Sequence, residues 1–489
     1  MYLSTRGNMP PQSGRQVICQ GMVPAGGLYV PQTFPRLDWR TYQAYTYQEL
    51  ALELMALFLP DVERSYLAET AGVYAEPAFD SDNPAPLVRV GDVGILELWH
   101  GPTAAFKDMA LQVLPRLMSY SMRLESPGQE ILILTATSGD TGKAALEGFK
   151  DVPGVRIMVF YPDGGVSPVQ ERQMLTTAGK NTTVVAVNGN FDQCQSAVKD
   201  VFTAFASGRL AANKQTTLSS ANSINWGRLL PQIVYYVWAY VNAVRQNMLA
   251  SDALLNVVVP TGNFGNILAA YYAKRMGIPL GALICASNKN NVLSDFFTDG
   301  VYNSRRPFYL TMSPSMDILI SSNLERFLFE MCGRDGARMQ AWYAALSAEG
   351  TFRLDAETLA ACRENIVAGW SNEEAVLAVI RQYYEQYHYV LDPHTAVAAD
   401  VYENYRRESG DVRPTLLVST ASPYKFAHSV LTGMNGQASA GPWEALNQLE
   451  EITHWQIPAN LRDLPAQAAR ERILCPAPEI EAFVARFLA

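Results

Sequence analysis

Short apolar segments that alternate with helical patterns are the feature that most restricts the fold of this chain. Residues 131–134 (ILIL), 155–162 (VRIMVFYP), 255–259 (LNVVV) and 415–418 (TLLV) are almost continuously apolar. The first and third of these segments run through Gly-rich turns into helical patterns. Strands that are apolar on both faces belong in parallel sheets covered by helices on both sides. The sequence therefore predicts an α/β protein.

The expected elements divide the chain into three parts. We assign residues 129–214 to a small α/β domain, residues 96–128 and 215–489 to a large domain, and residues 1–95 to an N-terminal domain. The N-terminal part differs from the rest because it is rich in Pro and Gly over residues 23–35 and has one clear helical pattern, from Tyr47 to Phe58. We expect the tail from residue 449 onward to form helices that pack on the large domain.

Charge and composition exclude several classes of protein. A formal net charge of −9 argues against a nucleic-acid-binding or anionic-membrane surface, since both need concentrated positive charge. No segment reaches the roughly 18 consecutive apolar residues of a membrane span, and residues 1–16 lack the apolar core of a signal sequence. The six cysteines form no CxxC and the five histidines no HExxH, so we expect no metal site. We expect a cytoplasmic monomer or homodimer that acts on a small molecule.

The segment PTGNFGN, residues 260–266, follows an apolar strand and precedes a helix. Gly262 and Gly265 allow the backbone to approach an anion closely, and the N–H groups at the helix start would point toward it. A phosphate fits here without a cationic side chain. The segment does not match GxGxxG, so it does not indicate a dinucleotide-binding fold.

The segment TSGDTGKAA, residues 137–145, is similar to a nucleotide P-loop but fails two of its requirements. Thr137 stands where a P-loop needs glycine, and Ala144 stands where a hydroxyl should coordinate magnesium. An ATP site is therefore disfavoured. What remains is a second cradle of hydroxyl and N–H groups that suits a carboxylate or a phosphate.

Lys107 follows the apolar run Pro102 to Phe106 in HGPTAAFKD. Burial disfavours the charged form of an amine, which lowers its pKa and leaves a neutral nucleophile suited to Schiff-base chemistry. A lysine of this kind, together with two anion cradles, supplies the parts needed to use pyridoxal 5′-phosphate (PLP) on an amino acid.

Several segments resemble threonine synthase of the longer bacterial and fungal kind. They are YLSTRG, GLYVPQTFPRL, HGPTAAFKD, TSGDTG, SSANSINWGRLLPQ, PTGNFGN and STASPYKF, and the resemblance runs from residue 2 to about residue 430. It implies the β-family PLP fold (fold type II, like the tryptophan synthase β subunit). That fold has a large and a small α/β domain with PLP between them, and here an additional N-terminal domain.

The resemblance also implies roles for individual residues. Lys107 would form the internal aldimine and carry protons, and Thr420 would contact the pyridine nitrogen as a neutral partner. The loop implied to hold the PLP phosphate consists of Gly262, Asn263, Phe264, Gly265 and Asn266. The residues implied to face the substrate carboxylate are Ser138, Gly139, Asp140 and Thr141. Because the charge of Asp140 would repel a carboxylate, we expect its backbone or a helix-capping role to matter there.

The family reaction requires a second anion site, for the phosphate of the substrate. The segment SANSINWGR offers Ser223, Asn225 and Arg228, and Lys143 is another candidate cation. Asn225 and Arg228 are three residues apart and would share one face of a helical turn, and an arginine fork suits a phosphate.

The implied reaction converts O-phospho-L-homoserine and water to L-threonine and phosphate by β,γ-elimination and replacement. Ser422 stands where family members often carry His, and Tyr424 where many carry a small residue. Two alternatives therefore stay open. A related phospho-lyase would release 2-oxobutanoate, ammonia and phosphate with the same cofactor groups. A non-catalytic PLP-binding protein would not need the nucleophilic amine.

Overall fold

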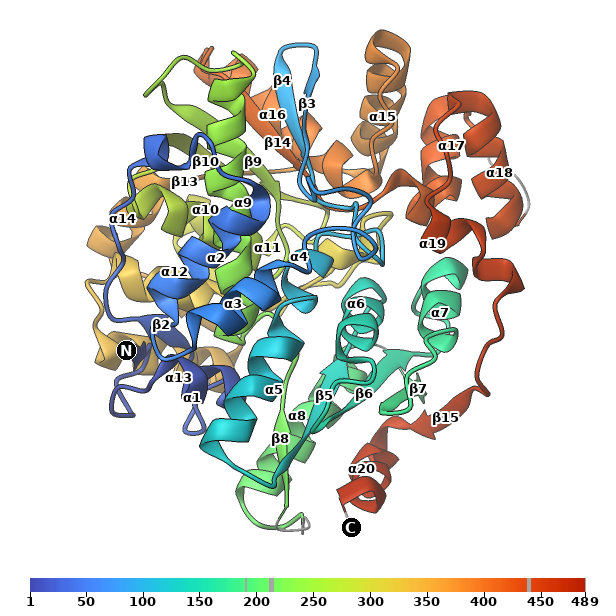
Figure 1. Cartoon of the computed structure of the whole chain (residues 1–489). Coiled ribbons are helices and arrows are strands. Elements are labelled where there is room, and N and C mark those ends of the chain that lie inside the picture. Colours follow the sequence, from blue (N-terminus) through green and yellow to red (C-terminus); the bar gives the residue numbers. More distant parts are fainter. Residues whose placement is uncertain (190, 211–214, 438–440, 489) are drawn as a thin grey trace.

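A six-stranded sheet forms the larger of two main sheets in the computed structural model, which describes residues 1–189, 191–210, 215–437 and 441–488 (Figure 1). The strand order is β13-β10-β9-β14-β4-β3, and every neighbouring pair is parallel except β3 with β4. The strands are β3 (Leu87–Val90), β4 (Val93–Glu97), β9 (Leu255–Pro260), β10 (Leu280–Ser287), β13 (Ile366–Trp370) and β14 (Thr415–Ser419).

A five-stranded, fully parallel sheet lies beside the first, with the order β15-β7-β6-β5-β8. Its strands are β5 (Glu130–Ala136), β6 (Val155–Pro162), β7 (Thr182–Asn188), β8 (Thr216–Ser219) and β15 (Ile473–Pro476). The predicted strands at 131–134 and 155–162 correspond to β5 and β6, and those at 255–259 and 415–418 to β9 and β14. The predicted α/β class is confirmed.

Helices cover the larger sheet on both faces, as its continuous apolar strands require. Val257 and Val259 of β9 join the core beneath α9 and α10, whereas Val258 joins a separate core with α15, α16 and α17. Helices associated with this sheet are α9 (Trp226–Arg245), α10 (Gly265–Arg275), α11 (Val292–Asp299), α12 (Leu324–Met331), α13 (Gly336–Glu349), α14 (Ala356–Asn365), α15 (Glu373–Tyr387), α16 (Pro393–Ser409), α17 (Ala427–Asn435), α18 (Pro442–Thr453) and α19 (Ala459–Arg462).

The smaller sheet has its own set of helices, and Figure 1 places it in the lower part of the molecule near the C-terminus. Helices α6 and α8 pack on its strands, and α20 packs on α8. The helices of this region, together with the two that precede it in the chain, are α4 (Asp108–Leu111), α5 (Leu114–Glu125), α6 (Asp140–Phe149), α7 (Pro168–Leu175), α8 (Phe191–Ala206) and α20 (Ile480–Leu488).

The N-terminal segment packs against the long helices of both regions. Helix α2 has the predicted bounds, and Thr46 and Glu49 form a capping box at its start. Helix α2 packs on α9, and α1 packs on α5, so this segment shares one apolar core with the two sheets. Its elements are β1 (Tyr2–Ser4), α1 (Gly14–Gln20), β2 (Tyr29–Pro31), α2 (Tyr47–Phe58) and α3 (Arg64–Ala71). Outside this segment, β11 (Val301–Asn303) and β12 (Thr351–Arg353) form a separate two-stranded sheet.

The strands depart from the expected ranges in three places. Strands β3 and β4 begin within residues 1–95 yet belong to the larger sheet, while β8 and β15 lie outside 129–214 yet belong to the smaller one. The end of the tail pairs with β7 and packs on α8 instead of the larger sheet. Parallel pairing between segments far apart in the sequence leaves no local signal. We keep the division into three domains as a proposal, with these strands reassigned.

No helix in the described part of the chain combines the length and the apolar character needed to cross a membrane.

Candidate active site

A cavity between the two sheets collects most of the residues singled out in the sequence. It is lined by the segments that follow β5 and β9, by Lys107 and Thr420, and by the start of α9. Ligands of open α/β sheets bind where the strands end in loops. The predicted residues in its wall are Lys107, Ser138, Thr141, Ser223, Arg228, Gly262, Asn263, Phe264, Gly265, Asn266 and Thr420.

Lys107 is buried at the entry to α4, as its apolar context predicts. Its Nζ lies 4.8 Å from the centre of the Phe106 ring and 3.8 Å from Oδ2 of Asp140. Burial lowers the pKa of Lys107 to about 8, an effect that the Asp140 carboxylate opposes and the cations Lys425 and Arg228 reinforce. With a pKa of about 8, roughly a tenth of the Lys107 amine is neutral at pH 7, far more than for an ordinary lysine.

Asp108, the next residue, does not pair with Lys107. Its carboxylate accepts hydrogen bonds from the N–H (2.8 Å) and hydroxyl (2.7 Å) of Thr103 and so closes the loop that carries the lysine. Burial raises the pKa of Asp108 to about 6, while the bonds from Thr103 act in the opposite direction. Asp108 thus shapes the loop and leaves the amine of Lys107 facing the cavity.

The loop between β9 and α10 presents a row of free N–H groups. Phe264 adopts a left-handed backbone (φ 62°) before α10, which has no side-chain cap. Among the described residues, the N–H groups of 263–267 find no acceptor. The buried Nδ2 of Asn266 also lacks a partner, although its Oδ1 accepts bonds from Tyr235 (2.7 Å) and Tyr236 (2.5 Å). Unpaired donors at a helix start suit a phosphate.

A second row of donors lies at the start of α6, where Ser138 and Thr141 face the cavity. The hydroxyl of Thr137 accepts bonds from the N–H groups of Gly139 (3.0 Å) and Gly142 (2.8 Å) and fixes the turn. Gly139 itself does not line the cavity. It has φ 127°, and a Cβ there would overlap the Gln170 amide. This turn is therefore restricted to glycine.

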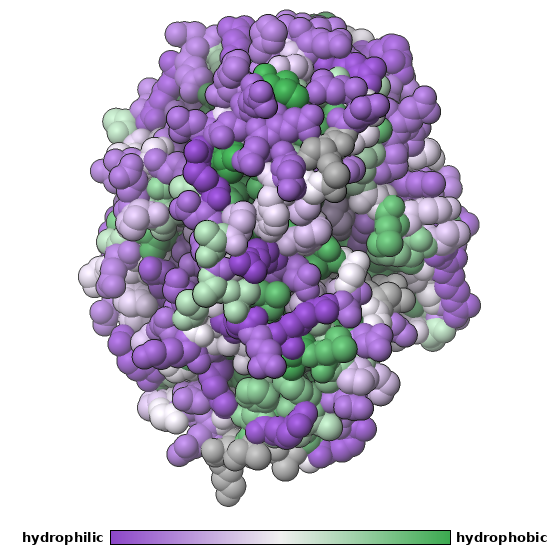
Figure 2. All heavy atoms as spheres, turned by 90° about the vertical axis from the view of Figure 1, so that its right-hand side faces the viewer, coloured by the Kyte–Doolittle hydropathy of each residue, from purple (hydrophilic) through white to green (hydrophobic). Residues whose placement is uncertain are grey.

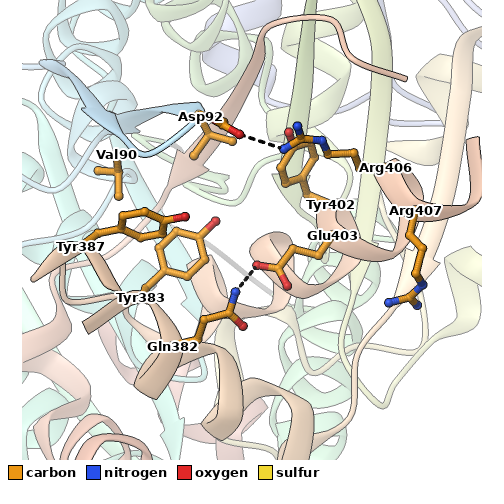
Figure 3. Close-up of a pocket in the computed structure, with 10 residues that line it drawn as sticks. Val90, Asp92, Gln382, Tyr383, Tyr387, Tyr402, Glu403, Arg406 and Arg407 are labelled. Atoms are coloured by element: carbon orange, nitrogen blue, oxygen red, sulfur yellow. Dashed lines mark hydrogen bonds and ion pairs between the residues drawn. The ribbon is translucent and has the colours of Figure 1, made fainter. Parts of the chain in front are cut away.

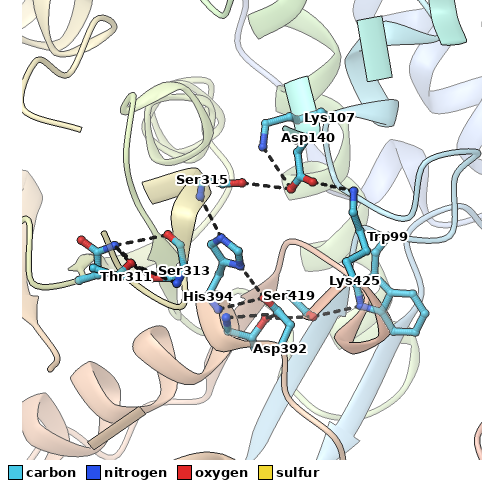
Figure 4. A network of polar contacts seen from close by, with 12 residues as sticks. Trp99, Lys107, Asp140, Thr311, Ser313, Ser315, Asp392, His394, Ser419 and Lys425 are labelled. Carbon is cyan, nitrogen blue, oxygen red and sulfur yellow. Dashed lines mark hydrogen bonds and ion pairs between the residues drawn. The ribbon is translucent and has the colours of Figure 1, made fainter. Parts of the chain in front are cut away.

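Asp140 points its carboxylate at two lysines (Figure 4). It does not cap α6, which has no side-chain cap, so the expected capping role is wrong, whereas a role for its backbone stays a prediction. Oδ1 lies 2.6 Å from Nζ of Lys425 and accepts a bond from Gln170 (2.9 Å). Oδ2 accepts a bond from the Ser315 hydroxyl (3.0 Å) and lies 3.8 Å from Lys107. Burial alone would raise the pKa of Asp140, but Lys425 and Lys107 hold it well below its ordinary value.

His394, which was not singled out in the sequence, continues this network. It lines the cavity, and its Nε2 accepts the N–H of Ser315 at 3.3 Å (Figure 4). Its Nδ1 lies 2.8 Å from Oδ1 of Asp392, so the neutral ring carries its proton on Nδ1. In the sequence, Asp-Pro-His resembles an ordinary helix start, and Asp392 does cap α16. His100, which pairs with Glu97 and Asp80, does not line the cavity.

Arg228 is a buried cation without an acidic partner in the described part of the chain. Its Nη1 donates to the Ala221 carbonyl (2.6 Å), and its Nε is buried without any partner. Burial lowers its pKa to about 10, so it stays charged at neutral pH. Ser223, nearby in the wall, accepts a bond from Asn323 (2.9 Å). A cation in this setting suits an anionic ligand.

Four predicted residues do not line the cavity, namely Gly139, Asp140, Asn225 and Lys143. Asn225 caps α9 through the N–H of Gly227 (2.9 Å) and donates to the Ile18 carbonyl (3.0 Å). Lys143 lines a different pocket, where its Nζ donates to Glu147 (2.8 Å) and Thr177 (2.9 Å). Lys143 follows the cradle directly in sequence, but its amine is committed to a carboxylate one helical turn away. Neither the Asn225 nor the Lys143 side chain lines the cavity that contains Lys107.

Gln195 and Lys199 of α8 contribute to the wall and were missed in the sequence. They lie one helical turn apart on one face, a spacing that a solvated surface helix shares. Lys199 is exposed and forms no ion pair with any described residue. The hydroxyl of Thr420 likewise makes no hydrogen bond with the described residues, whereas its carbonyl accepts the N–H of Phe106 (2.8 Å).

Ser422 and Tyr424, the two departures from the family pattern, are buried outside the cavity wall. The N–H of Ser422 donates to the Ala104 carbonyl at 3.0 Å, and the Tyr424 hydroxyl donates to the Trp455 carbonyl. Ser422 thus holds the loop that carries Lys107, and neither residue lines the cavity.

A separate pocket opens between α15, α16 and the β3–β4 strands (Figure 3). Its charged side chains are committed to neighbours: Glu403 to Gln382 (3.0 Å), and Arg406 to Asp92 (3.3 Å). In the described part of the chain, no group of three or more His, Cys, Asp or Glu residues could hold a metal ion. The cavity at Lys107, with its unpaired donors and buried amine, is the candidate active site.

Two family models match the chain: "Threonine synthase N terminus" over residues 1–71 and "Pyridoxal-phosphate dependent enzyme" over residues 71–421. The chain belongs to the threonine synthase family of PLP-dependent enzymes. Threonine synthase of Saccharomyces cerevisiae is 36% identical over 471 residues, which cover 89% of each chain. That of Pseudomonas aeruginosa is 38% identical over 450 residues, 90% of this chain and 92% of the relative.

Human threonine synthase-like 1 is 39% identical over 455 residues, which are 88% of this chain but only 60% of that protein. The chain therefore spans well under two thirds of the length of that relative. The PLP-bound structure of threonine synthase from Brucella melitensis is 35% identical, with a TM-score of 0.86 over 100% of this chain and 99% of the other. The yeast enzyme gives a TM-score of 0.87 at 32% identity, over 99% and 98%. The predicted type II fold and PLP cofactor are confirmed.

The turn before α6 gives a stability test. Replacing Gly139 with Ala places a side chain against Gln170 in a backbone conformation that only glycine adopts readily. Gly164 has φ 71° and open space around it, so Gly164→Ala is the matched control. We expect Gly164→Ala to cost about 1 kcal/mol of unfolding free energy and Gly139→Ala at least about 2 kcal/mol more. Equal losses in urea unfolding would contradict the crowding of Gly139.

Proposed function

We propose that the protein is a threonine synthase that converts O-phospho-L-homoserine and water to L-threonine and phosphate with PLP. The observation that carries the proposal is the buried Lys107 amine, which shares one cavity with the 263–267 N–H row and with Arg228, a buried cation that has no acidic partner among the described residues. A substrate that carries both an α-amino acid group and a phosphate, together with the cofactor phosphate, requires more than one anion site.

The residues present fit PLP. Its phosphate would be held by the free N–H groups of 263–267 and the unpaired Nδ2 of Asn266. The hydroxyl of Thr420, which makes no hydrogen bond with the described part of the chain, would meet the ring nitrogen as an uncharged partner. When bound, PLP supplies an aldehyde for the Lys107 amine and a ring system that stabilises negative charge at the α-carbon of the substrate.

Lys107 would also move protons. A buried amine with a pKa near 8 can both accept and release a proton close to neutral pH, because its pKa lies near the pH of the solution. We infer that Nζ removes the proton at the α-carbon and serves again at a neighbouring carbon when phosphate leaves. The Phe106 ring and the surrounding apolar loop keep water away from this nitrogen.

The α-carboxylate of the substrate would lie at the start of α6. Ser138 and Thr141 offer hydroxyls there, and the N–H groups of the first helical turn offer donors. Asp140 does not oppose a carboxylate as strongly as an isolated charge would, because Lys425 neutralises it at 2.6 Å. Gly139 contributes the backbone shape of the turn.

The phosphate of the substrate would meet Arg228 and the hydroxyl of Ser223. Lys199 and Gln195 face the same cavity from α8, on the other sheet, and offer a further cation and an amide. We propose these four residues, in place of Lys143 and Asn225, as the second anion site. The cytoplasmic location and the monomeric or dimeric state stay predictions.

A phospho-lyase that releases 2-oxobutanoate, ammonia and phosphate is the second candidate. The 39% identity to human threonine synthase-like 1 keeps it in view beside the threonine synthases. The two reactions use the same lysine, the same cofactor and the same anion sites. They differ only in whether water is added to the β-carbon before the product leaves.

Product analysis separates the candidates. Purified PLP-loaded protein should show the visible absorption of a lysine imine and should form L-threonine and phosphate in equal amounts from O-phospho-L-homoserine. Lys107→Ala should lose that absorption and lower turnover by about a thousandfold or more. Lys180→Ala, at an exposed lysine, is the control and should behave as wild type. Formation of 2-oxobutanoate and ammonia would establish the phospho-lyase, and an intact imine with no turnover would exclude both reactions.

Arg228 should control the affinity for phosphate-bearing ligands. Arg228→Met retains a similar apolar stem and removes the charge, so we expect KM for O-phospho-L-homoserine and the inhibition constant of inorganic phosphate to rise about tenfold to hundredfold. Arg245→Met is the matched control, because Arg245 ends the same helix and donates to backbone carbonyls away from the cavity. If both variants bind phosphate like wild type, Arg228 has no part in the second anion site.

A further inference from the structure

The carboxylate of Asp140 lies between two lysines that differ in their exposure to the cavity. Lys425, in the short 3₁₀ helix η3 (Pro423–Phe426), is fully buried and does not line the cavity, whereas Lys107 does. Nζ of Lys425 lies 2.6 Å from Oδ1 of Asp140, and it also donates to the Thr103 carbonyl at 3.0 Å. Nζ of Lys107 lies 3.8 Å from the other carboxylate oxygen, beyond hydrogen-bond distance.

We propose that Lys425 is a positioning residue that holds Asp140 in a closed ion pair and thereby leaves the Lys107 amine free to add to an aldehyde. This inference rests on the proposed function in one respect, namely that Lys107 is the amine that condenses with PLP. Lys425 itself touches neither cofactor nor substrate and acts through Asp140.

The argument follows from the charges buried at this point. A buried carboxylate whose only cationic partner was Lys107 would approach that amine and stabilise its protonated form. Lys425 prevents this in two ways. It satisfies Asp140 at shorter distance, and its own positive charge disfavours a second cation nearby. The pKa of Lys107 of about 8 reflects burial first, with Asp140 raising it and Lys425 and Arg228 lowering it.

The ion pair with Lys425 also leaves Asp140 with a cationic partner when the charge on Lys107 changes. An amine that loses its charge on reaction would leave its carboxylate partner buried and uncompensated, which is strongly destabilising. Because Lys425 stays in place, Asp140 has a cationic partner in every state of Lys107. Gln170 and Ser315 add hydrogen bonds that favour the ionised carboxylate throughout.

No other charged group described around Lys107, Asp140 and Lys425 takes the place of Lys425 as the ion-pair partner of Asp140. Asp108, the other carboxylate beside Lys107, is bonded to Thr103. Behind Ser315, His394 accepts the N–H of Ser315 and lies 2.8 Å from Asp392, and it forms no hydrogen bond or ion pair with Asp140. Arg228 faces the Lys107 amine from α9 but forms no ion pair with Asp140. Lys425 is therefore the cation that stays in contact with Asp140 while Lys107 reacts.

The test measures the basicity of Lys107 directly, without substrate. Full-length protein is freed of PLP and exposed to brief pulses of acetic anhydride between about pH 6 and pH 11, and acetylation at residue 107 is followed by peptide mass spectrometry. Wild type should give an apparent pKa near 8 for Lys107. Lys425→Met should raise it by about one unit or more, and Lys425→Arg, which keeps the charge, should restore the wild-type profile. Lys274→Met, at a half-buried lysine bonded to the Gly281 carbonyl, is the control and should leave the profile unchanged.

A second comparison covers the case in which Lys425→Met does not fold. It uses Asp140→Asn and the double variant Asp140→Asn with Lys425→Met, neither of which leaves an unpaired carboxylate buried at position 140. The apparent pKa of Lys107 should be higher in the double variant than in Asp140→Asn, because a like charge has been removed. An unchanged profile in either comparison, or failure of Lys425→Arg to restore it, would overturn the proposal. Because no turnover is measured, the outcome is independent of whether the protein makes threonine.

Discussion

The removal of water from one amine, that of Lys107, is the constraint on which the rest of the site depends. Its loop is closed by the bonds from Thr103 to Asp108, and the neighbouring Asp140 is held by Lys425, so the amine sits beside a carboxylate without forming a tight ion pair. Burial and two nearby cations then lower its pKa toward neutrality. The Schiff-base role that we propose for Lys107 depends on this local balance of burial and charge.

The arrangement of the two sheets brings the other parts of the site to that amine. The loop after β9 and the start of α6 come from different sheets, and each presents N–H groups at the first turn of a helix. Helix α9, which packs on the N-terminal helix α2, carries Arg228 at its start. Under the proposed function, the cofactor phosphate, the substrate carboxylate and the substrate phosphate would each lie at a separate place with its own donors.

Much of the fold and of the candidate site could be predicted from the sequence, because the patterns that indicate them involve residues close together in the chain. Helix 47–58, strand 155–162, the 262–266 loop and the buried Lys107 each depend on neighbouring residues, and the structure has them as expected. The failures concern side-chain partners and strands that are distant in sequence. The partner of Asp140, Lys425, lies far along the chain, and β15 joins β7 through parallel pairing that no local pattern reveals. Lys143 is a different case, because its partner Glu147 is only one helical turn away and the sequence does not show which of its neighbours its amine will contact.

The central claim is that the amine of Lys107, among all the lysines of the chain, is the one that captures the PLP aldehyde. Reduction of PLP-loaded protein with borohydride fixes the cofactor to the lysine that holds it, and peptide mapping then identifies that residue. The account predicts that the reduced cofactor is found on Lys107, in about one equivalent per chain. Attachment to Lys425, or spread over exposed lysines with Lys107 unmodified, would contradict it.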